Sequence, residues 1–352
     1  MKKFILLFAV MIAVGAYAQT DAEAPERKNW DREKLYGRVK SVTIEQYELN
    51  PFIGEYCVYY SEVYKFDKNG DVVEHSFAEN EEGISKYKYV YDKNRNVVEE
   101  ISFNPKGEIV EKIVYTYNEH GKVVDEILYL GDDLINCNYK LVRSYNDEGW
   151  LLGGVAYDGN GGILYEYSFV YDDKGQRVRE VFEDIIYVFE YDDNGHRTSQ
   201  ATYSSDEISN RSTLFRYDDK GLCVEESWLD GEGNLDTLVT MKYNDAGGLI
   251  EYLMYDSEGD IVEVFYAEYD EHGNMIEKYD SRSIGAYQAH YFYEYDEKGR
   301  EVECSALFNT FQNRFVSSYD SHDNLILVDI YEELEIGDIL SQKEIRKIEY
   351  RN

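Results

Sequence analysis

Seven acidic residues form the regular series in this chain that is best placed to do chemistry. They are Glu74, Glu99, Asp125, Glu225, Glu251, Glu277 and Glu303, and most neighbours are 25 or 26 residues apart. A row of carboxylates could bind a cation or a basic partner. On alternate strands the neighbours would lie roughly 10 Å apart, too far to share one Ca²⁺, whose ligands lie at about 2.3–2.6 Å. We therefore interpret the row as solvated or as hydrogen-bonded to tyrosines.

The chain lacks the patterns of common reaction centres. Asp-rich turns such as DKNGD, from Asp67 to Asp71, resemble calcium loops but lack the glycine position and the later bidentate Glu of an EF-hand. No Gly-x-Ser-x-Gly elbow, phosphate-binding glycine loop, Cys-x-x-Cys or His-x-x-x-His pair occurs. Six histidines are scattered: His75, His120, His196, His272, His290 and His322. We expect no catalytic residue, no cofactor and no metal.

Aromatic side chains are the alternative source of function. The chain has 36 Tyr, and aromatic residues make up 15% of it. Tyr rows could stack on sugars or bind a protein, but at strict strand spacing a Tyr stripe belongs to the core. Aromatic residues outside that spacing are better contact candidates: Trp30, Trp150, Trp228, Tyr252 and Tyr266.

A Tyr-Asp-x-x-Gly signature organises almost the whole chain. Its eleven anchors are Phe66, Tyr91, Tyr117, Tyr145, Tyr171, Tyr191, Tyr217, Tyr243, Tyr269, Tyr295 and Tyr319, most of them 26 residues apart. Nine copies have the turn glycine: Gly70, Gly121, Gly149, Gly175, Gly195, Gly221, Gly247, Gly273 and Gly299. Arg95 and Asp323 replace glycine in the other two copies. A period of this length indicates a repeat architecture.

Each repeat predicts two antiparallel strands and two turns. Before an anchor, apolar and polar residues alternate, as at Tyr115 and Thr116, which is typical of a strand with one buried face. Asp-x-x-Gly fits a type I turn whose glycine takes a left-handed conformation. The two positions six and seven after the anchor are both apolar in most copies, which indicates either a β-bulge or two covered faces. We expect an all-β, antiparallel meander or solenoid of about eleven 26-residue hairpin repeats. So many strands should twist or curl into a spiral sheet or shell.

Composition restricts the partners and the cysteine chemistry. The formal net charge is −35, which disfavours nucleic acids and anionic lipids. Cys57, Cys137, Cys223 and Cys304 are about three repeats apart, roughly 29 Å along a regular sheet, whereas a disulfide needs Cα atoms within about 7 Å. We expect small buried side chains rather than disulfides.

Three regions follow from the order of these patterns. Residues 1–18 have two lysines, an apolar run and Ala16-Tyr17-Ala18, which are the parts of a secretory signal peptide. Residues 19–34 are a polar, flexible lead-in, and residues 35–352 form a single repeat domain. The apolar run is too short for a transmembrane helix. We expect an exported protein that is periplasmic, secreted or at the cell surface.

The repeated signature with its following apolar pair resembles the YD repeats of the RHS family of bacterial surface and toxin-delivery proteins. The resemblance covers about residues 35 to 350. It implies long β-strand spirals that wrap into hollow shells, and an encapsulating or surface-adhesive role. Two departures from the family pattern lead us to expect architecture rather than a toxin: we find no variable toxic segment and no self-cleaving core segment up to Arg351 and Asn352.

We therefore expect a non-enzymatic repeat scaffold that binds a protein or a glycan through its extended sheet. One alternative is a shell or chaperone for a separately encoded toxin. Another is a glycan-active enzyme, which a buried carboxylate pair in a cleft would support.

Overall fold

The computed structural model describes residues 35–50, 52–79, 83–131, 136–204, 210–282, 287–308, 311–334 and 337–351, and every element within them is a β-strand. No helix in these ranges could cross a membrane. The expected signal peptide and lead-in lie outside the described residues. The first twelve strands are β1 (Val39–Asn50), β2 (Glu55–Phe66), β3 (Val72–Glu79), β4 (Ile84–Tyr91), β5 (Val97–Phe103), β6 (Ile109–Tyr117), β7 (Val123–Leu130), β8 (Tyr139–Tyr145), β9 (Leu151–Asp158), β10 (Ile163–Tyr171), β11 (Arg177–Phe182) and β12 (Ile185–Tyr191). The other twelve are β13 (Arg197–Tyr203), β14 (Arg211–Tyr217), β15 (Cys223–Leu229), β16 (Leu235–Tyr243), β17 (Leu249–Tyr255), β18 (Ile261–Tyr269), β19 (Met275–Arg282), β20 (Tyr287–Tyr295), β21 (Glu301–Phe308), β22 (Gln312–Tyr319), β23 (Leu325–Leu334) and β24 (Gly337–Tyr350).

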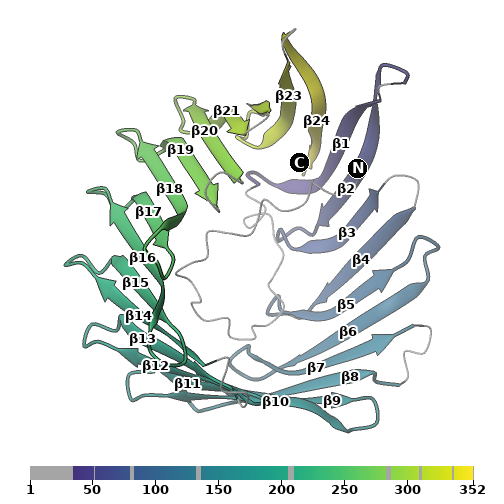
Figure 1. Ribbon diagram of the computed structural model, residues 1–352. Helices are drawn as coiled ribbons and strands as arrows, with labels where there is room; N and C mark the ends of the chain where they lie inside the picture. The colour runs from purple at the N-terminus through teal and green to yellow at the C-terminus, as the bar shows by residue number, and fades with distance from the viewer. Residues whose placement is uncertain are drawn as a thin grey trace.

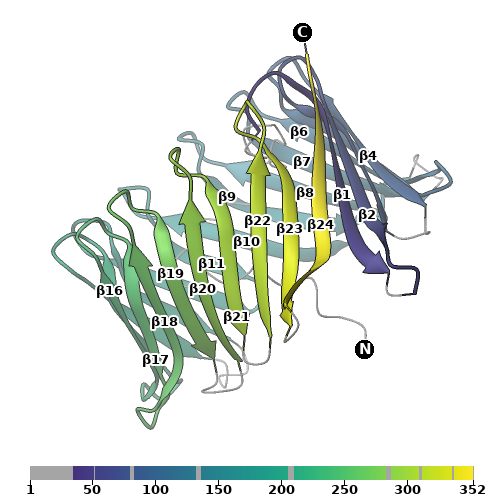
Figure 2. The ribbon, with the colours of Figure 1, turned by 90° about the horizontal axis from the view of Figure 1, so that it is seen from above.

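The strands form one closed antiparallel barrel (Figure 1). Each strand pairs with its neighbours in the chain, and β1 also pairs with β24, from Val39 opposite Tyr350 to Glu48 opposite Gln342. Figure 2 shows β24 beside β1 on the near side of the ring. The predicted antiparallel meander is confirmed, but the predicted spiral is wrong. The repeats account for β2 to β23, so their pattern holds no information about the pairing of β1 with β24.

The Asp-x-x-Gly turns are tight hairpins with a positive φ at the glycine. In the turn at Asp270, the amide of Asp270 donates to the carbonyl of Asn274, and its carboxylate accepts from the amides of His272 and Asn274. Gly273 has φ +85°. Arg95 and Asp323 take the same conformation, at φ 69° and 68°, where a side chain is disfavoured.

A β-bulge follows every one of these turns. In the first repeat Lys65 pairs with Glu74, but Phe66 pairs with Val72, so that Val73 is an extra residue. The same shift precedes each of the eleven anchors. The bulge explains the two successive apolar positions after the anchor, because two residues there oppose one residue of the partner strand.

A hydroxyl hydrogen bond from each anchor tyrosine connects successive repeats. The ladder between β3 and β4 ends at Glu74 and Lys88, so the carbonyl of Val72 lies beyond it. The hydroxyl of Tyr91 donates to this carbonyl at 2.5 Å. All ten Tyr anchors make the equivalent bond, at 2.5–3.0 Å. Phe66, the only anchor without a hydroxyl, begins the series and has no preceding repeat to join.

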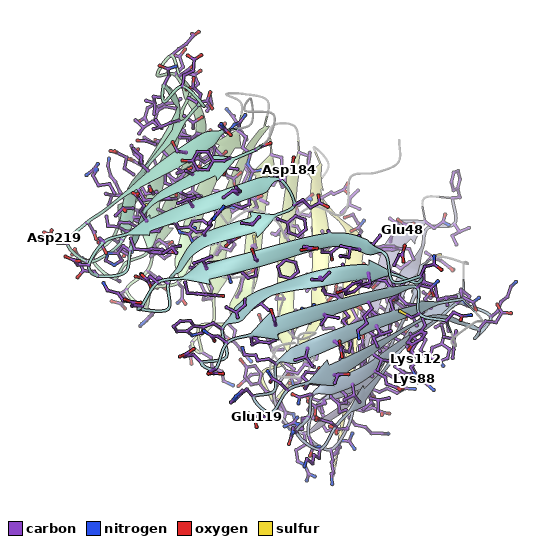
Figure 3. The ribbon with its side chains drawn as sticks, turned by 90° about the horizontal axis from the view of Figure 1, so that it is seen from below. Glu48, Lys88, Lys112, Glu119, Asp184 and Asp219 are labelled. Atoms are coloured by element: carbon purple, nitrogen blue, oxygen red, sulfur yellow. The ribbon has the colours of Figure 1, made fainter. Side chains whose placement is uncertain are left out.

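The two faces of the barrel wall carry different side chains. Lys88 and Lys112 lie on the outer side in Figure 3, and since side chains alternate along a strand, Tyr89 and Tyr115 point inward. Tyr89 is 6% exposed and Tyr115 8%. The three hydrophobic clusters of the wall include such inward residues. The aromatic residues two positions before the anchors are therefore core, as their spacing indicates.

The four cysteines are free thiols. Cys304 is buried, while Cys137 and Cys223 are half-buried. Burial raises the pKa of the Cys223 thiol to about 11. Cys57 is exposed, so the prediction of buried thiols is wrong at this position, which lies on β2 outside the packed part of the wall.

Glu226 on β15 is a carboxyl buried within the wall. It is 4% exposed and accepts a hydrogen bond from the indole nitrogen of Trp228 at 3.1 Å. Burial raises its pKa, because the charged form loses its hydration. The folded protein therefore favours the neutral carboxyl, and ionisation of Glu226 opposes folding.

Replacing Tyr243 with Phe should destabilise the barrel. The change removes the 2.8 Å hydrogen bond to the carbonyl of Cys223 and should lower the free energy of unfolding by about 1–3 kcal/mol. Chemical denaturation would measure this. Tyr203→Phe, at a tyrosine that is 49% exposed, is the control and should have little effect; equal losses in both variants would contradict the role of the anchor hydroxyl.

A disulfide should form across the β1–β24 seam. Thr43 and Lys347 are direct cross-strand partners, and such Cα atoms lie about 4.5–5.5 Å apart, within disulfide reach. In a Cys57→Ser background, Thr43→Cys with Lys347→Cys should oxidise to an intramolecular bridge, seen as a mobility shift without reductant. Thr43→Cys with Lys242→Cys should not. An open sheet would give no bridge in either variant.

The effect of Glu226→Gln on stability should depend on pH. A raised folded-state pKa means that the neutral carboxyl's contribution is present at acid pH and is lost as pH rises through that pKa. The variant's melting temperature should exceed that of the wild type at pH 8, and the gain should shrink toward pH 4. Glu268→Gln, on the exposed outer face, serves as control. A gain that is independent of pH would argue against ionisation as the cause.

Candidate functional site

The acidic row lies on the outer face, and each of its seven carboxylates contacts a basic side chain of the same chain. The pairs are Lys65–Glu74, Lys112–Glu99, Lys140–Asp125, Arg216–Glu225, Lys242–Glu251, His290–Glu277 and Arg314–Glu303, at 2.6–3.4 Å. Exposed pairs of this kind contribute little to stability. Ion pairs with basic side chains on neighbouring strands explain the row better than a cation site does. They also take the place of the hydrogen bonds to tyrosine that the sequence led us to expect.

The histidines and carboxylates do not form a metal centre in the described part of the chain, where no group of three or more potential ligands occurs. His75 contacts Glu62 at 2.6 Å and stacks on Tyr64. His196 contacts Asp192 at 3.1 Å. The histidines at 120, 272 and 322 lie in exposed turns, and the one at position 290 is on the outer face.

No pair of buried carboxylates occurs among the described residues. The two buried acidic side chains are Asp71 and Glu226. Asp71 accepts hydrogen bonds from Arg95, and Glu226 lies on β15, many strands away. Asp71 and Glu226 are therefore not a carboxylate pair of the kind that glycoside hydrolysis uses.

The aromatic contact candidates separate clearly by exposure. Trp150 packs against the ring of Tyr171 at 5.3 Å. Trp228 is held by Glu226, and Tyr252 is 9% exposed. Trp30 lies outside the described residues. Tyr266 is 43% exposed, so it is the candidate that remains available for contact.

Tyr266 belongs to a row of rings that crosses the outer face of β18, β19 and β20, three strands that lie side by side in Figure 2. Tyr266 is the direct partner of Tyr279, and Tyr279 is the direct partner of His290. Phe292 lies two residues beyond His290 on the same face. Ring centroids are 6.4 Å apart for Tyr266–Tyr279, 5.9 Å for Tyr279–His290 and 4.3 Å for His290–Phe292. We call these four residues the aromatic strip.

The aromatic strip breaks the repeat pattern of the outer face. Tyr266 and Phe292 occupy the position three before the anchor, and Tyr279 occupies the position ten after it. At these two positions the other repeats carry only aliphatic, small or polar residues: Val63, Ser76, Lys88, Ile101, Val114, Ile127, Val142, Val155, Ser168, Val181, Val188, Ala201, Leu214, Ser227, Thr240, Leu253, Ser305, Val316 and Asp329. A site formed once in an otherwise repetitive wall is the arrangement that selective binding requires.

Carboxylates border the aromatic strip at its β17 end and on the side nearer the turns. Glu251 is the direct partner of Tyr266 and is paired with Lys242 at 2.7 Å. Glu277 is the direct partner of Phe292 and contacts the imidazole of His290 at 2.6 Å. Flat rings beside carboxylate acceptors and basic donors can stack on a ligand and hydrogen-bond its polar edges. Sequence reasoning found Tyr266 alone, because the other three rings join it only through strand register.

A cavity of about 460 Å³ lies at the rim formed by the turns, lined by Asp192, His196, Tyr217, Asp218 and other residues. The His196 ring stacks on Tyr217, with centroids 4.8 Å apart. Trp150 covers Tyr171 in the same way two repeats earlier. The rim therefore repeats a packing arrangement, and the aromatic strip is the stronger candidate site.

No family model matches the chain, and no curated protein matches it. Among solved structures, TcdB2-TccC3 is similar over 79% of this chain and 20% of that chain, with 10% identity and a TM-score of 0.43. TcdB2-TccC3 without its hypervariable C-terminal region is similar over 79% of this chain and 19% of that chain, with 11% identity and a TM-score of 0.34. A porin-like protein from Bacteroides uniformis is similar over 90% of this chain and 99% of that chain, with 10% identity and a TM-score of 0.26. The chain spans about a fifth of the TcdB2-TccC3 chain. Membership of the RHS family stays a prediction, and no function is transferred from these distant likenesses.

Proposed function

We propose that the protein is an exported, non-enzymatic scaffold that binds a protein or a glycan through the aromatic strip, at the cell surface or in the periplasm. The observation that carries this proposal is the single interruption of the repeat pattern by Tyr266, Tyr279 and Phe292 on the outer face. The barrel closes on itself, so it has no free sheet edge for a partner strand to pair with. Recognition must therefore use side chains or turns rather than strand addition at a sheet edge.

The apparent signal peptide supports export. The net charge of −35 supports a neutral or basic ligand over an anionic one. The ion pairs made by all seven carboxylates of the acidic row support a structural role for that row.

A shell for a separately encoded toxin is a second candidate, because the wall is closed. The diameter of a barrel grows with strand number, and 16–18 strands already leave a channel. A ring of 24 strands should therefore enclose more space than its own side chains fill. The inner wall carries aromatic residues and ion pairs such as Arg143–Glu126 at 2.8 Å.

Binding to cell-envelope material would test the proposed scaffold. Labelled residues 19–352 should be retained by sedimented Gram-negative envelope fragments, and Tyr266→Ala with Phe292→Ala should reduce retention at least ten-fold. Tyr203→Ala is the matched control, because this outer-face tyrosine is 49% exposed and lies outside the strip. Equal retention of the double variant and the wild type, or release of soluble products from the fragments, would overturn the proposal.

A further inference from the structure

We infer that the ligand of the aromatic strip is a neutral, extended glycan lying across β18, β19 and β20. This inference rests on the proposed function and names the ligand class of the same site. Its basis is the shape of the strip, the chemistry at its borders and the small apolar area that it exposes.

The strip has the shape of a linear ligand. Tyr266, Tyr279 and His290 are direct partners on three successive strands, so the row runs perpendicular to the strands over roughly 10 Å. Phe292 widens it by one position along β20. The rings of Tyr266 and Tyr279, whose planes are 26° apart, can stack on successive sugar units of an extended chain. The His290 ring lies at 90° to that of Tyr279.

The borders of the strip suit hydroxyl groups. Glu277 and its direct partner Glu268, which is exposed, lie on the side nearer the turns. Glu251 is the direct partner of Tyr266 and lies at the β17 end of the row. Gln288, which is exposed, lies on the other side, opposite the buried Ser281. Carboxylates and amides accept hydrogen bonds from sugar hydroxyls. The same carboxylates repel sulfated or uronic-acid polymers, as does the net charge of −35.

The exposed apolar area is too small for the centre of a protein interface. Tyr266 is 43% exposed and Phe292 is 39% exposed, while Tyr279 and His290 are half-buried. With aromatic side chains of about 150–250 Å² each, the strip offers a few hundred Å² at most. A stable protein interface buries roughly 800 Å² per partner. A narrow ligand matches this area better than a second folded protein does.

Affinity gel electrophoresis with pure polysaccharides would test the ligand class. The net charge of −35 drives the chain strongly toward the anode, so retardation is easily measured. The probes are neutral β-glucan, xyloglucan and galactomannan, with alginate as the anionic comparison. At least one neutral polymer should retard residues 19–352 and the Tyr203→Ala control, whereas Tyr266→Ala with Phe292→Ala should weaken binding at least ten-fold. Phe292→Leu, which keeps an apolar side chain without a ring, should weaken it less but measurably.

Three results would overturn the glycan assignment: no retardation by any neutral polymer, stronger retardation by alginate, or equal binding by the double variant. Retention by envelope fragments that have been treated with periodate or with protease would distinguish failure of the glycan assignment from failure of the proposed scaffold function. Strip-dependent retention that protease abolishes and periodate spares would reject the glycan and keep the scaffold. Loss after periodate alone would support the glycan. Thermal melting of each variant would show whether lost binding reflects lost folding.

Discussion

The hydrogen bond from each anchor hydroxyl to a main-chain carbonyl of the preceding repeat is the interaction on which the barrel depends. The ladder between adjacent repeats stops short of the turn, which leaves one carbonyl, such as that of Val72, beyond its last strand pair. Tyr91 satisfies it. A buried carbonyl left unpaired is costly, and the early end of this ladder would leave one in every repeat. The hydroxyl of the repeated tyrosine thus supplies the hydrogen bond that the ladder between repeats does not provide.

The seam between the first and last strands is held by a related set of bonds. Asn324 is fully buried; its side-chain amide donates to the carbonyl of Tyr36 at 2.8 Å, and its carbonyl accepts from the amide of Tyr36 at 2.6 Å. It also donates to the hydroxyl of Tyr350 at 2.7 Å. The guanidinium of Arg351 donates to the carbonyl of Phe66. The last repeat therefore bonds to the N-terminal segment and to β24 through Asn324, in place of the anchor-hydroxyl bond that joins successive repeats.

The sequence predicts the local structure of each hairpin far better than it predicts the closure of the barrel or the position of the aromatic strip. Turn, strand alternation and repeat number follow from Asp, Gly and the anchors because each acts within one hairpin. Closure depends on β1 and β24, which carry no copy of the signature. The aromatic strip shows the same limit: Tyr266 is recognisable as an aromatic residue outside the core spacing, but Tyr279 and Phe292 become its neighbours only through the cross-strand register. Trp228 and Tyr252 break the spacing equally, yet they pack inside, because exposure depends on the side of the wall to which a residue points.

The repeat length has a consequence for how such a barrel can change size. An antiparallel ring needs an even number of strands, and each repeat contributes two. Duplication or loss of one whole repeat therefore preserves parity and alters the circumference by about 10 Å, leaving β1 and β24 to meet as before. The shortest interval, 20 residues between Tyr171 and Tyr191, still supplies a complete pair, β11 and β12. Genetic duplication of single hairpin units can accordingly resize the ring, whereas gain of half a unit would leave the two end strands parallel and end the all-antiparallel pairing.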